Sequence, residues 1–284
     1  MNDIEARFAQ HAAGLQILEI ISLIFLLLIV SETVWDVLTG RRAKLSETGA
    51  NVAIALVNGL LERTAFGAIF VIGLAIAEPF ALWSIPQTWW SWCLALLAAD
   101  FTYYWMHRFE HEVRVLWAYH SVHHSSHEFN LTTALRLAWV EGLIEWLFFV
   151  PMILLGFDLV QTIICLAIVV AYQTWIHTEK VGKLGWLDRV FNTPSVHRVH
   201  HGCNEEYLDK NYGGILIVWD RLFGTYKEEG AKVTYGITEP LGTANPIRIN
   251  MQEFASILRD VSRARTLAEA CNYLFGRPGW RPPD

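Results

Sequence analysis

Five long apolar runs divide this chain, and they restrict its possible folds more than any other feature. The first, residues 15–34, is apolar from Ile20 to Val30 except for Ser22. At about 1.5 Å per residue, a helix of this length crosses most of a hydrocarbon core of about 30 Å. The other four runs are residues 51–77, 84–106, 139–156 and 158–176. Because backbone polar groups inside a bilayer must be satisfied within the segment, we predict an all-α integral membrane protein with about five transmembrane helices.

The composition indicates a membrane protein that also has a sizeable polar part. Hydrophobic residues make up 53% of the chain and charged residues 18%, which is too apolar for a single soluble domain. The segments between the apolar runs are nevertheless long and polar, so part of the chain must lie in water. The net charge is −6 and no long block of lysine and arginine occurs, so we expect no nucleic-acid partner.

Charges beside the first run predict the orientation of the chain. Arg41, Arg42 and Lys44 follow this run, and positive residues are enriched in cytoplasmic loops, so we place the N-terminus outside the cytoplasm. Alternation then brings the ends of the third and fifth helices to the cytoplasmic face. The predicted regions are residues 1–106 with the first three transmembrane helices, 107–137 as a cytoplasmic segment, 138–177 as a transmembrane hairpin and 178–284 as a cytoplasmic helical cap with a C-terminal tail.

The histidines are concentrated in the segments that this topology places in the cytoplasm. Ten of the eleven lie between His107 and His201. Eight of them form three tight groups, which are His107/His111, His120/His123/His124 and His197/His200/His201. Their spacings are those of neighbours on one helix face, so the imidazoles of a group can converge on one point. Such convergence indicates a metal site.

The number of imidazoles indicates two ions. With His177, which ends the fifth apolar run, there are nine candidate ligands, and zinc sites usually take only four. Imidazole-rich sites also suit iron, copper and nickel. We therefore predict a dimetal site with two iron ions, while zinc could replace them in a purified form. The nine predicted metal ligands are His107, His111, His120, His123, His124, His177, His197, His200 and His201.

Several carboxylates and amides lie where they could orient these imidazoles. Asp100 precedes His107 by seven residues on the same helix face, and a metal-bound imidazole commonly donates its second N–H to a carboxylate. The alternative is that Asp100 pairs with Arg108 or with backbone. Four more candidates flank the last histidine group, and they could equally serve as turn or capping residues. They are Asp188, Asn192, Asp209 and Asn211.

The order of the motifs resembles a known family. H-x-x-x-H, H-x-x-H-H, a lone histidine and a second H-x-x-H-H follow one another, as in the fatty acid hydroxylase/sterol desaturase superfamily of membrane diiron oxygenases. The motifs Asn-Thr-Pro-Ser-Val-His-Arg-Val-His-His-Gly at 192–202 and Asp-Lys-Asn-Tyr-Gly-Gly at 209–214 are most similar to those of the alkylglycerol monooxygenase group. The resemblance extends over roughly residues 100–282. His127 stands where that group has an acidic residue, so we do not count it as a ligand.

The resemblance implies a function. It predicts an O2-dependent iron enzyme that hydroxylates a lipid C–H bond, with the carbon beside the ether oxygen of an alkylglycerol lipid as one target. The alternative target is a sterol or fatty acyl chain, which would be hydroxylated or desaturated. A cytoplasmic electron donor is required, and tetrahydrobiopterin or a redox protein would serve. The non-enzymatic alternative is a membrane protein that binds or transports metal, but such a protein would carry its ligands at mid-membrane.

Overall fold

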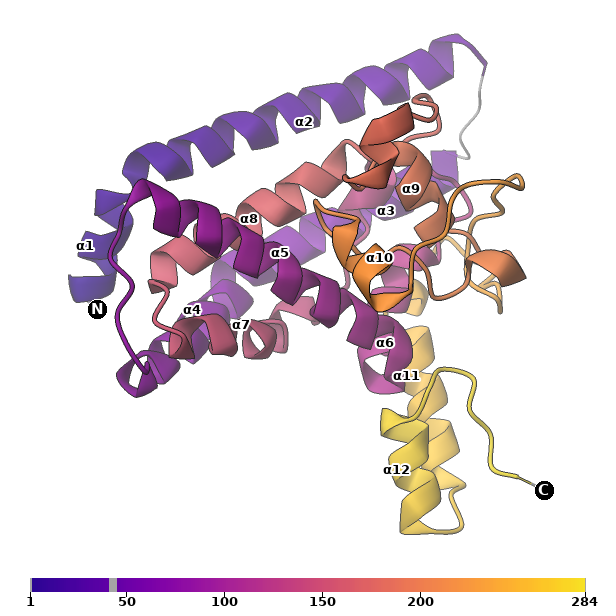
Figure 1. The fold of residues 1–284 in the computed structure, drawn as a ribbon. Coiled ribbons are helices and arrows are strands. Elements are labelled where there is room, and N and C mark those ends of the chain that lie inside the picture. The colour runs from indigo at the N-terminus through magenta and orange to yellow at the C-terminus, as the bar shows by residue number, and fades with distance from the viewer. Residues whose placement is uncertain (1, 41–44, 284) are drawn as a thin grey trace.

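The structure is a computed structural model that describes residues 2–40 and 45–283 (Figure 1). Within these residues the chain is helical, and its only β-structure is two isolated bridges, Phe191 with Leu216 and Gly202 with Tyr235. The all-α prediction is therefore confirmed. The three charged residues used to predict the orientation, Arg41, Arg42 and Lys44, lie outside the described residues.

The first apolar runs form long helices. A short helix, α1 (Asn2–Gln10), precedes α2 (Ala12–Leu38). A π-helical turn at Glu62–Phe66 joins α3 (Leu45–Leu61) to α4 (Gly67–Ala77), and a 3-10 turn follows at Glu78–Phe80. Two helical stretches of the described chain are long and apolar enough to cross a membrane, Ala12–Leu38 and Ser46–Phe80. This is fewer than the five predicted.

The predicted span over residues 139–156 is wrong as a single helix. A 3-10 turn (Glu141–Leu143) comes first, and α7 (Trp146–Leu154) has only 9 residues. Nine residues of helix extend about 14 Å, roughly half of a hydrocarbon core. Gly142 lies in this irregular start, and its lack of a side chain allows the close approach of the Glu62 carboxylate of the π turn.

The fifth apolar run forms α8 (Leu159–Thr174), which folds back on α7 as the second arm of the predicted hairpin. Gly156 makes the turn between them with a φ of 88°. This conformation favours glycine. A side chain at this position would also collide with the Trp83 carbonyl. At the start of α8 the Asp158 carboxylate accepts a hydrogen bond from the Gln161 N–H at 3.0 Å.

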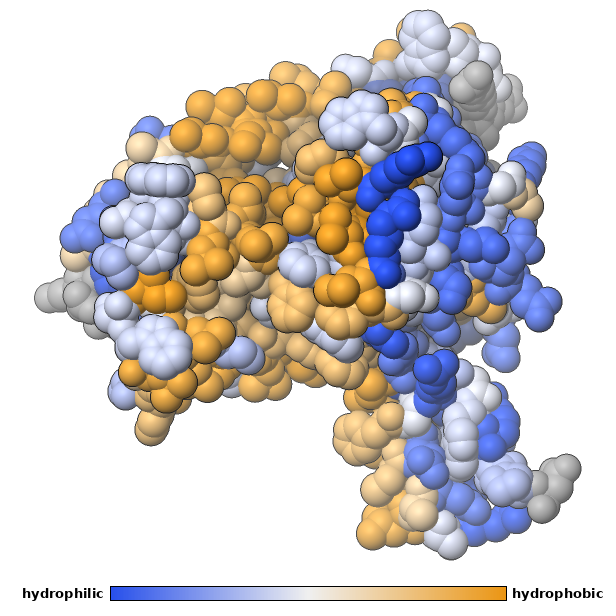
Figure 2. Space-filling model, viewed as in Figure 1, coloured by the Kyte–Doolittle hydropathy of each residue, from blue (hydrophilic) through white to orange (hydrophobic). Residues whose placement is uncertain are grey.

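The central helix is α5 (Trp89–Glu112). Its residues Ala95, Ala99 and Met106 belong to the main apolar core, together with buried side chains of α4, α7 and α8. In contrast, α2 lies along the outside of this bundle (Figure 1), and Ile29, Glu32 and Asp36 are its only described buried residues. The bundle therefore presents a broad apolar surface, which is visible in Figure 2.

The remaining helices gather at the end of the bundle where α5 ends. Val113 is extended, with φ −118° and ψ 117°, and reverses the chain into α6 (Arg114–His124). After α8 come α9 (Pro194–His200) and α10 (Val218–Phe223), whereas α11 (Pro246–Ser262) and α12 (Leu267–Phe275) form an arm that projects from this end (Figure 1). Three short 3-10 turns complete the described elements, Leu131–Leu135, Gly185–Arg189 and Glu205–Tyr207.

Candidate metal centre

All nine predicted ligands converge, and they do so in two groups. The five-histidine group is His107, His111, His120, His124 and His200, and the four-histidine group is His123, His177, His197 and His201. Every one of these side chains is buried. Within each group, one ring nitrogen from each residue lies within 4.8 Å of those of the others. Each group is thus compact enough to surround a single ion.

The helices divide the H-x-x-H-H motifs between the two groups. On α6, the i, i+4 pair His120 and His124 joins the five-histidine group, while His123 joins the other. At α9 the allocation is reversed, because the i, i+4 pair His197 and His201 joins the four-histidine group. Sequence spacing suggested that each motif would converge on one point. Instead, each motif contributes to both groups, and α6 and α9 together bring the two groups next to each other.

The distances between ring nitrogens fit a metal ion within each group. In the five-histidine group, the Nε2 atom of His120 lies 3.0 Å from that of His107 and 3.2 Å from that of His124. In the other group, the Nε2 atom of His177 lies 3.1 Å from that of His123 and 3.0 Å from that of His197. With metal–nitrogen bonds of about 2.0–2.1 Å, two ligands at right angles would be about 3 Å apart.

Backbone carbonyls determine which ring nitrogen is free. The Nδ1 atom of His107 lies 2.8 Å from the Tyr212 carbonyl oxygen, and that of His177 lies 2.7 Å from the Gln173 oxygen. A carbonyl oxygen can only accept, so both Nδ1 atoms carry the proton and both Nε2 atoms offer a lone pair. The Nε2 atoms of these two rings therefore face other imidazoles in the form that binds a metal.

Other ring nitrogens are buried without a partner. His200 donates from Nδ1 to the Lys210 carbonyl at 2.9 Å, and its Nε2 has no hydrogen-bond partner. The Nε2 atoms of His111 and His201 are likewise buried and unpaired. Buried polar atoms are rarely left unsatisfied in native proteins. A metal ion in each group would satisfy them, so the residues present fit the predicted ions.

Burial keeps the imidazoles neutral. It lowers the pKa of His107 and of His177 to about 4, although the hydrogen bond to a backbone carbonyl raises each pKa partway back. Burial also lowers the pKa of His124 and His201 well below the ordinary value, and nearby imidazoles lower it further. Neutral imidazole is the form that coordinates metals, so these rings need lose no proton near pH 7 to bind a metal.

Glu110 is a residue of the site that the sequence analysis missed. It is 1% exposed, and its Oε2 atom lies 3.2 Å from Nδ1 of His120, although the two are not aligned as an ideal hydrogen bond. The Tyr119 hydroxyl donates to Oε1 of Glu110 at 3.4 Å. A carboxylate behind a metal-bound imidazole is a common arrangement. The available signal was the position of Glu110 directly before His111, but only the return of α6 alongside α5 reveals its partner.

Asp100 binds no imidazole, which corrects the expected contact. Its carboxylate accepts hydrogen bonds from the N–H groups of Ile215 at 2.6 Å and Leu216 at 3.1 Å, and from the Trp219 indole at 2.9 Å. It is therefore a backbone anchor, which was the alternative interpretation. The anchored segment follows directly after Tyr212, whose carbonyl orients His107. Asp100 thus acts on the site only through this loop.

Two of the other candidates approach an imidazole. Asn192 donates from its side-chain nitrogen to the Gly213 carbonyl at 2.6 Å, and the same nitrogen lies 3.4 Å from Nδ1 of His197. The nearer carboxylate oxygen of Asp209 lies 3.9 Å from Nδ1 of His111, beyond hydrogen-bond distance. Asn192 is thus the one of the five predicted supporting residues that is in close contact with a ligand ring.

The last two candidates, Asp188 and Asn211, form hydrogen bonds with loop and backbone groups and not with imidazole rings. Asp188 accepts from the Leu184 N–H at 2.8 Å and from the Thr193 hydroxyl just before α9. Asn211 donates to the Val196 carbonyl at 3.0 Å and adopts a left-handed φ of 60°, which asparagine tolerates better than most residues. Both residues position the backbone on either side of the third histidine group.

His127 lies outside both groups. Its ring is exposed, and its Nδ1 atom lies 3.4 Å from the Tyr235 carbonyl oxygen. This position agrees with its exclusion from the predicted ligands.

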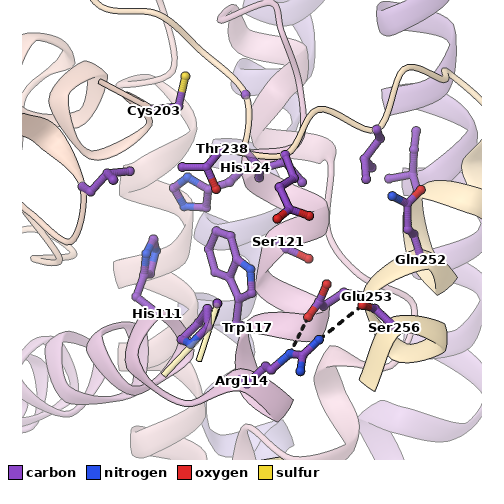
Figure 3. A pocket seen from close by; sticks show the side chains of 18 of the residues that line it. His111, Arg114, Trp117, Ser121, His124, Cys203, Thr238, Gln252, Glu253 and Ser256 are labelled. Carbon is purple, nitrogen blue, oxygen red and sulfur yellow. Dashed lines mark hydrogen bonds and ion pairs between the residues drawn. The ribbon is translucent and has the colours of Figure 1, made fainter. Parts of the chain in front are cut away.

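A cavity of about 890 Å³ opens onto the five-histidine group. His111, His124 and His200 line it, whereas no histidine of the other group does so among the described residues. In Figure 3, His111 and His124 lie on one side of the cavity and Gln252 and Glu253 of α11 on the other. Arg277 and Arg281 of the C-terminal segment also line it. A molecule of moderate size could therefore reach the five-histidine group from this side.

Comparisons with known proteins agree with this site. Residues 92–225 match the family model described as fatty acid hydroxylase. An alkylglycerol monooxygenase from Xenopus tropicalis is 43% identical over 70% of this chain and 44% of its own length, and one from Homo sapiens is 42% identical over 73% and 46%. An ornithine lipid hydroxylase from Rhizobium tropici is 30% identical over 63% and 57%.

These matches cover the chain and its relatives unequally. The chain spans less than half the length of the two monooxygenases. No solved structure matches it. The region that matches the family model includes all nine histidines of the two groups. By these matches the chain is similar to the fatty acid hydroxylase family over the region that holds both histidine groups.

Proposed function

We propose that this chain is a membrane oxygenase that hydroxylates a C–H bond of a lipid, with one iron ion in each histidine group. The observation that carries this proposal is the pair of adjacent groups of five and four buried, neutral imidazoles. When bound, such an ion pair supplies the activation of O2 and the oxidation of the C–H bond. Zinc, which binds similar ligands tightly, could occupy the same positions in purified protein.

The chain itself would hold and orient the ligands and keep water away. The Tyr212 and Gln173 carbonyls set the protonation of His107 and His177, and Glu110 would stabilise His120 as a ligand. Such supporting groups increase metal affinity and fix ring orientation. The burial of all nine rings limits access to the route through the cavity.

We propose an ether lipid as the substrate, since the similar proteins include alkylglycerol monooxygenases. One atom of O2 would enter the carbon beside the ether oxygen, and the other would leave as water with two electrons and two protons from a donor. The product is a hemiacetal, which breaks into an aldehyde and a glycerol. A reduced pterin such as tetrahydrobiopterin or a redox protein would supply the electrons from the cytoplasm.

A second candidate function acts on an acyl chain or sterol. The similar proteins also include a fatty acid hydroxylase and a sterol desaturase, which supports this alternative. The same site would then hydroxylate or desaturate that chain. A transporter is less well supported, because the ligands lie at helix ends and in a buried cluster, whereas a transporter would place them along a path through the membrane.

The proposed membrane topology keeps the histidines on the cytoplasmic face. We propose that α2, the α3–α4 stretch and the apolar part of α5 cross the bilayer, and that α7 and α8 enter it as a hairpin. A hairpin enters and leaves through the same face, so its depth does not change the side on which His177 emerges. The proposed regions are therefore residues 1–106, 107–137, 138–177 and 178–284, as expected from the sequence, with a shallower third region.

Isotope labelling tests the proposed reaction. The full chain, reconstituted in nanodiscs and loaded anaerobically with Fe(II), is given an alkylglycerol lipid, a reduced pterin and ¹⁸O2. We expect O2-dependent formation of an aldehyde that carries ¹⁸O, trapped by reduction to the alcohol before exchange with water. Parallel reactions with acyl and sterol lipids distinguish the second candidate. Absence of O2-dependent products with all three lipid classes and with either donor type would contradict the proposal.

A further inference from the structure

The arm formed by α11 and α12 carries apolar side chains that no other described part of the chain covers. On α11, Ile247 is 62% exposed, Met251 50% and Leu258 70%. These positions are separated by four and seven residues, so they form one stripe along the helix. Exposed apolar stripes of this kind indicate an interaction surface.

The same helix has two other faces with different surroundings. Ile249, Asn250 and Ile257 are buried against the body of the protein. Arg248, Gln252 and Arg259 line the cavity, and Ile247 and Met251 of the apolar stripe also border it. The stripe is therefore a third face beside the cavity, and Leu258 on this face lies outside the cavity lining. A soluble surface helix needs only a buried face and a polar face.

On α12 the apolar stripe continues. Leu267 is 81% exposed and Phe275 64%, with the exposed Cys271 between them at the same helical spacing. Tyr273 faces the other way and is buried beside Arg114, whose guanidinium lies 5.9 Å from the ring. Both helices of the arm thus expose an apolar stripe while their opposite sides contact the protein.

The arm is firmly attached, so its stripe has a defined direction. Arg114 of α6 donates to Glu253 at 2.9 Å and pairs with Asp260 at 2.7 Å. The Arg114 N–H also donates to the Gly276 carbonyl at 2.9 Å. Asn250 accepts from the Trp139 N–H at 3.0 Å. These contacts join both ends of the arm to the segments that surround the metal centre.

The apolar stripe of the arm and the apolar surface of the bundle face the same side of the molecule. In Figure 1 the arm projects sideways from the end of the bundle where α5 and α6 meet. In Figure 2 the apolar side of the arm is turned toward the same side of the molecule as the apolar surface of the bundle, and its other side is hydrophilic. The medium that surrounds the apolar surface of the bundle would therefore also contact the stripe.

The charges on the arm favour an anionic surface. Its exposed cations are Arg248, Arg259, Arg263 and Arg265. Glu253 and Asp260 share Arg114 as their partner, and Glu269 is the other carboxylate of the arm, so the arm together with Arg114 keeps a small net positive charge. Interfacial helices commonly combine a buried apolar face with arginines that contact anionic headgroups.

From these observations we infer that the α11–α12 arm lies in the headgroup region of an anionic bilayer, parallel to its surface, with the apolar stripe inserted. The mouth of the cavity beside α11 is then held at the level of lipid headgroups. This inference concerns membrane placement alone, and it does not depend on the oxygenase proposal.

Fluorescent labelling of the full chain in nanodiscs tests the inference. In a Cys93→Ser, Cys203→Ser, Cys271→Ser background, Met251→Cys or Leu258→Cys is labelled with an environment-sensitive dye. We expect blue-shifted emission and strong quenching by brominated lipids at both positions. The matched control is Gln252→Cys, which is adjacent in sequence but on the polar face, and its label should emit as in water and resist quenching.

Three outcomes are decisive. Strong lipid quenching at positions 251 and 258 with little at 252 supports the inference. Equal emission and quenching at all three positions would overturn it, and so would a blue shift without lipid quenching, since protein and not lipid would then cover the stripe. A Leu258→Glu, Leu267→Glu variant should lose the quenching at position 251 while its metal content stays unchanged, which separates this test from that of the metal centre.

Discussion

At the scale of single residues, the site depends on which nitrogen of each ring carries the proton. His107, His177 and His200 each donate from Nδ1 to a backbone carbonyl, so the backbone itself selects the metal-binding form of three rings. His120 differs, because the group nearest its Nδ1 is the carboxylate of Glu110. A side chain can be changed without moving the backbone, so His120 offers the clearest test of this support.

The variant Glu110→Gln should weaken metal binding by the five-histidine group. Loss of a group that supports a ligand typically lowers metal affinity about 10–100-fold. Competition with a chelator of known affinity measures this loss. The control is Glu112→Gln on the same helix, which removes a carboxylate paired with Arg108 at 3.0 Å and should leave affinity unchanged. Equal affinities for the Glu110→Gln variant and the original chain would contradict the role assigned to Glu110.

A second residue-scale prediction concerns acid stability near α9. Glu229 accepts from Arg198 and Ser195, and although burial alone would raise its pKa, these bonds lower it below the ordinary value of 4.5. Its stabilising contribution is therefore present above pH 4.5 and is lost as the pH falls through the lower, folded-state pKa. Glu229→Gln should be less stable than the original chain at pH 7, and the difference should shrink below pH 4.5. Thermal unfolding at a series of pH values measures it, and a difference that grows in acid would contradict it.

At the scale of elements, the ligands come from α5, α6, α9 and the segment that follows α8, and loops hold these elements together. The Asp100 carboxylate fastens the segment after Tyr212 to α5, and Gly214 allows the close approach, because a Cβ there would lie 2.9 Å from Oδ1 of Asp100. The position of His107 thus depends on a loop more than one hundred residues away in sequence.

Asp100→Asn should loosen this loop. An asparagine has one acceptor oxygen for three donors, and leaving buried donors unpaired costs about 1–3 kcal/mol each. We expect a free energy of unfolding lower by about 2 kcal/mol and weaker metal binding by the five-histidine group. Unfolding in nanodiscs with and without metal measures both effects. Glu228→Gln, which alters an exposed pair with Lys183, is the control and should change neither. Unchanged stability in Asp100→Asn would contradict the anchoring role.

The sequence predicts a feature correctly where residues of one kind are concentrated, and it fails where contacts between distant segments determine the structure. Apolar runs correctly predict the long helices, and the clustered histidines predict nine rings that do converge. The helix predicted over 139–156 is observed as a 3-10 turn and a nine-residue helix, and the packing of Gly142 against Glu62 there is a tertiary contact that hydropathy does not contain. The partners of Asp100 and Glu110 were missed for the same reason, because both depend on segments distant in sequence.

At the scale of the whole molecule, an apolar bundle ends in a buried cluster of imidazoles, and an arm with its own apolar stripe extends beside the cavity mouth. In the proposed membrane placement, this arrangement keeps the ligands out of the bundle interior and within reach of the bilayer surface. A lipid could then enter the cavity beside α11 without leaving the membrane environment. The proposed function requires that the two histidine groups hold two separate ions.

The most direct test of that claim is the metal content of the full chain and of three variants, purified anaerobically with Fe(II). The original chain should hold two ions. His120→Ala, His124→Ala should remove one by disrupting the five-histidine group, and His177→Ala, His197→Ala should remove the other. His127→Ala, outside both groups, should keep both ions. Finding one ion or fewer in the original chain, or two in either double variant, would contradict the account.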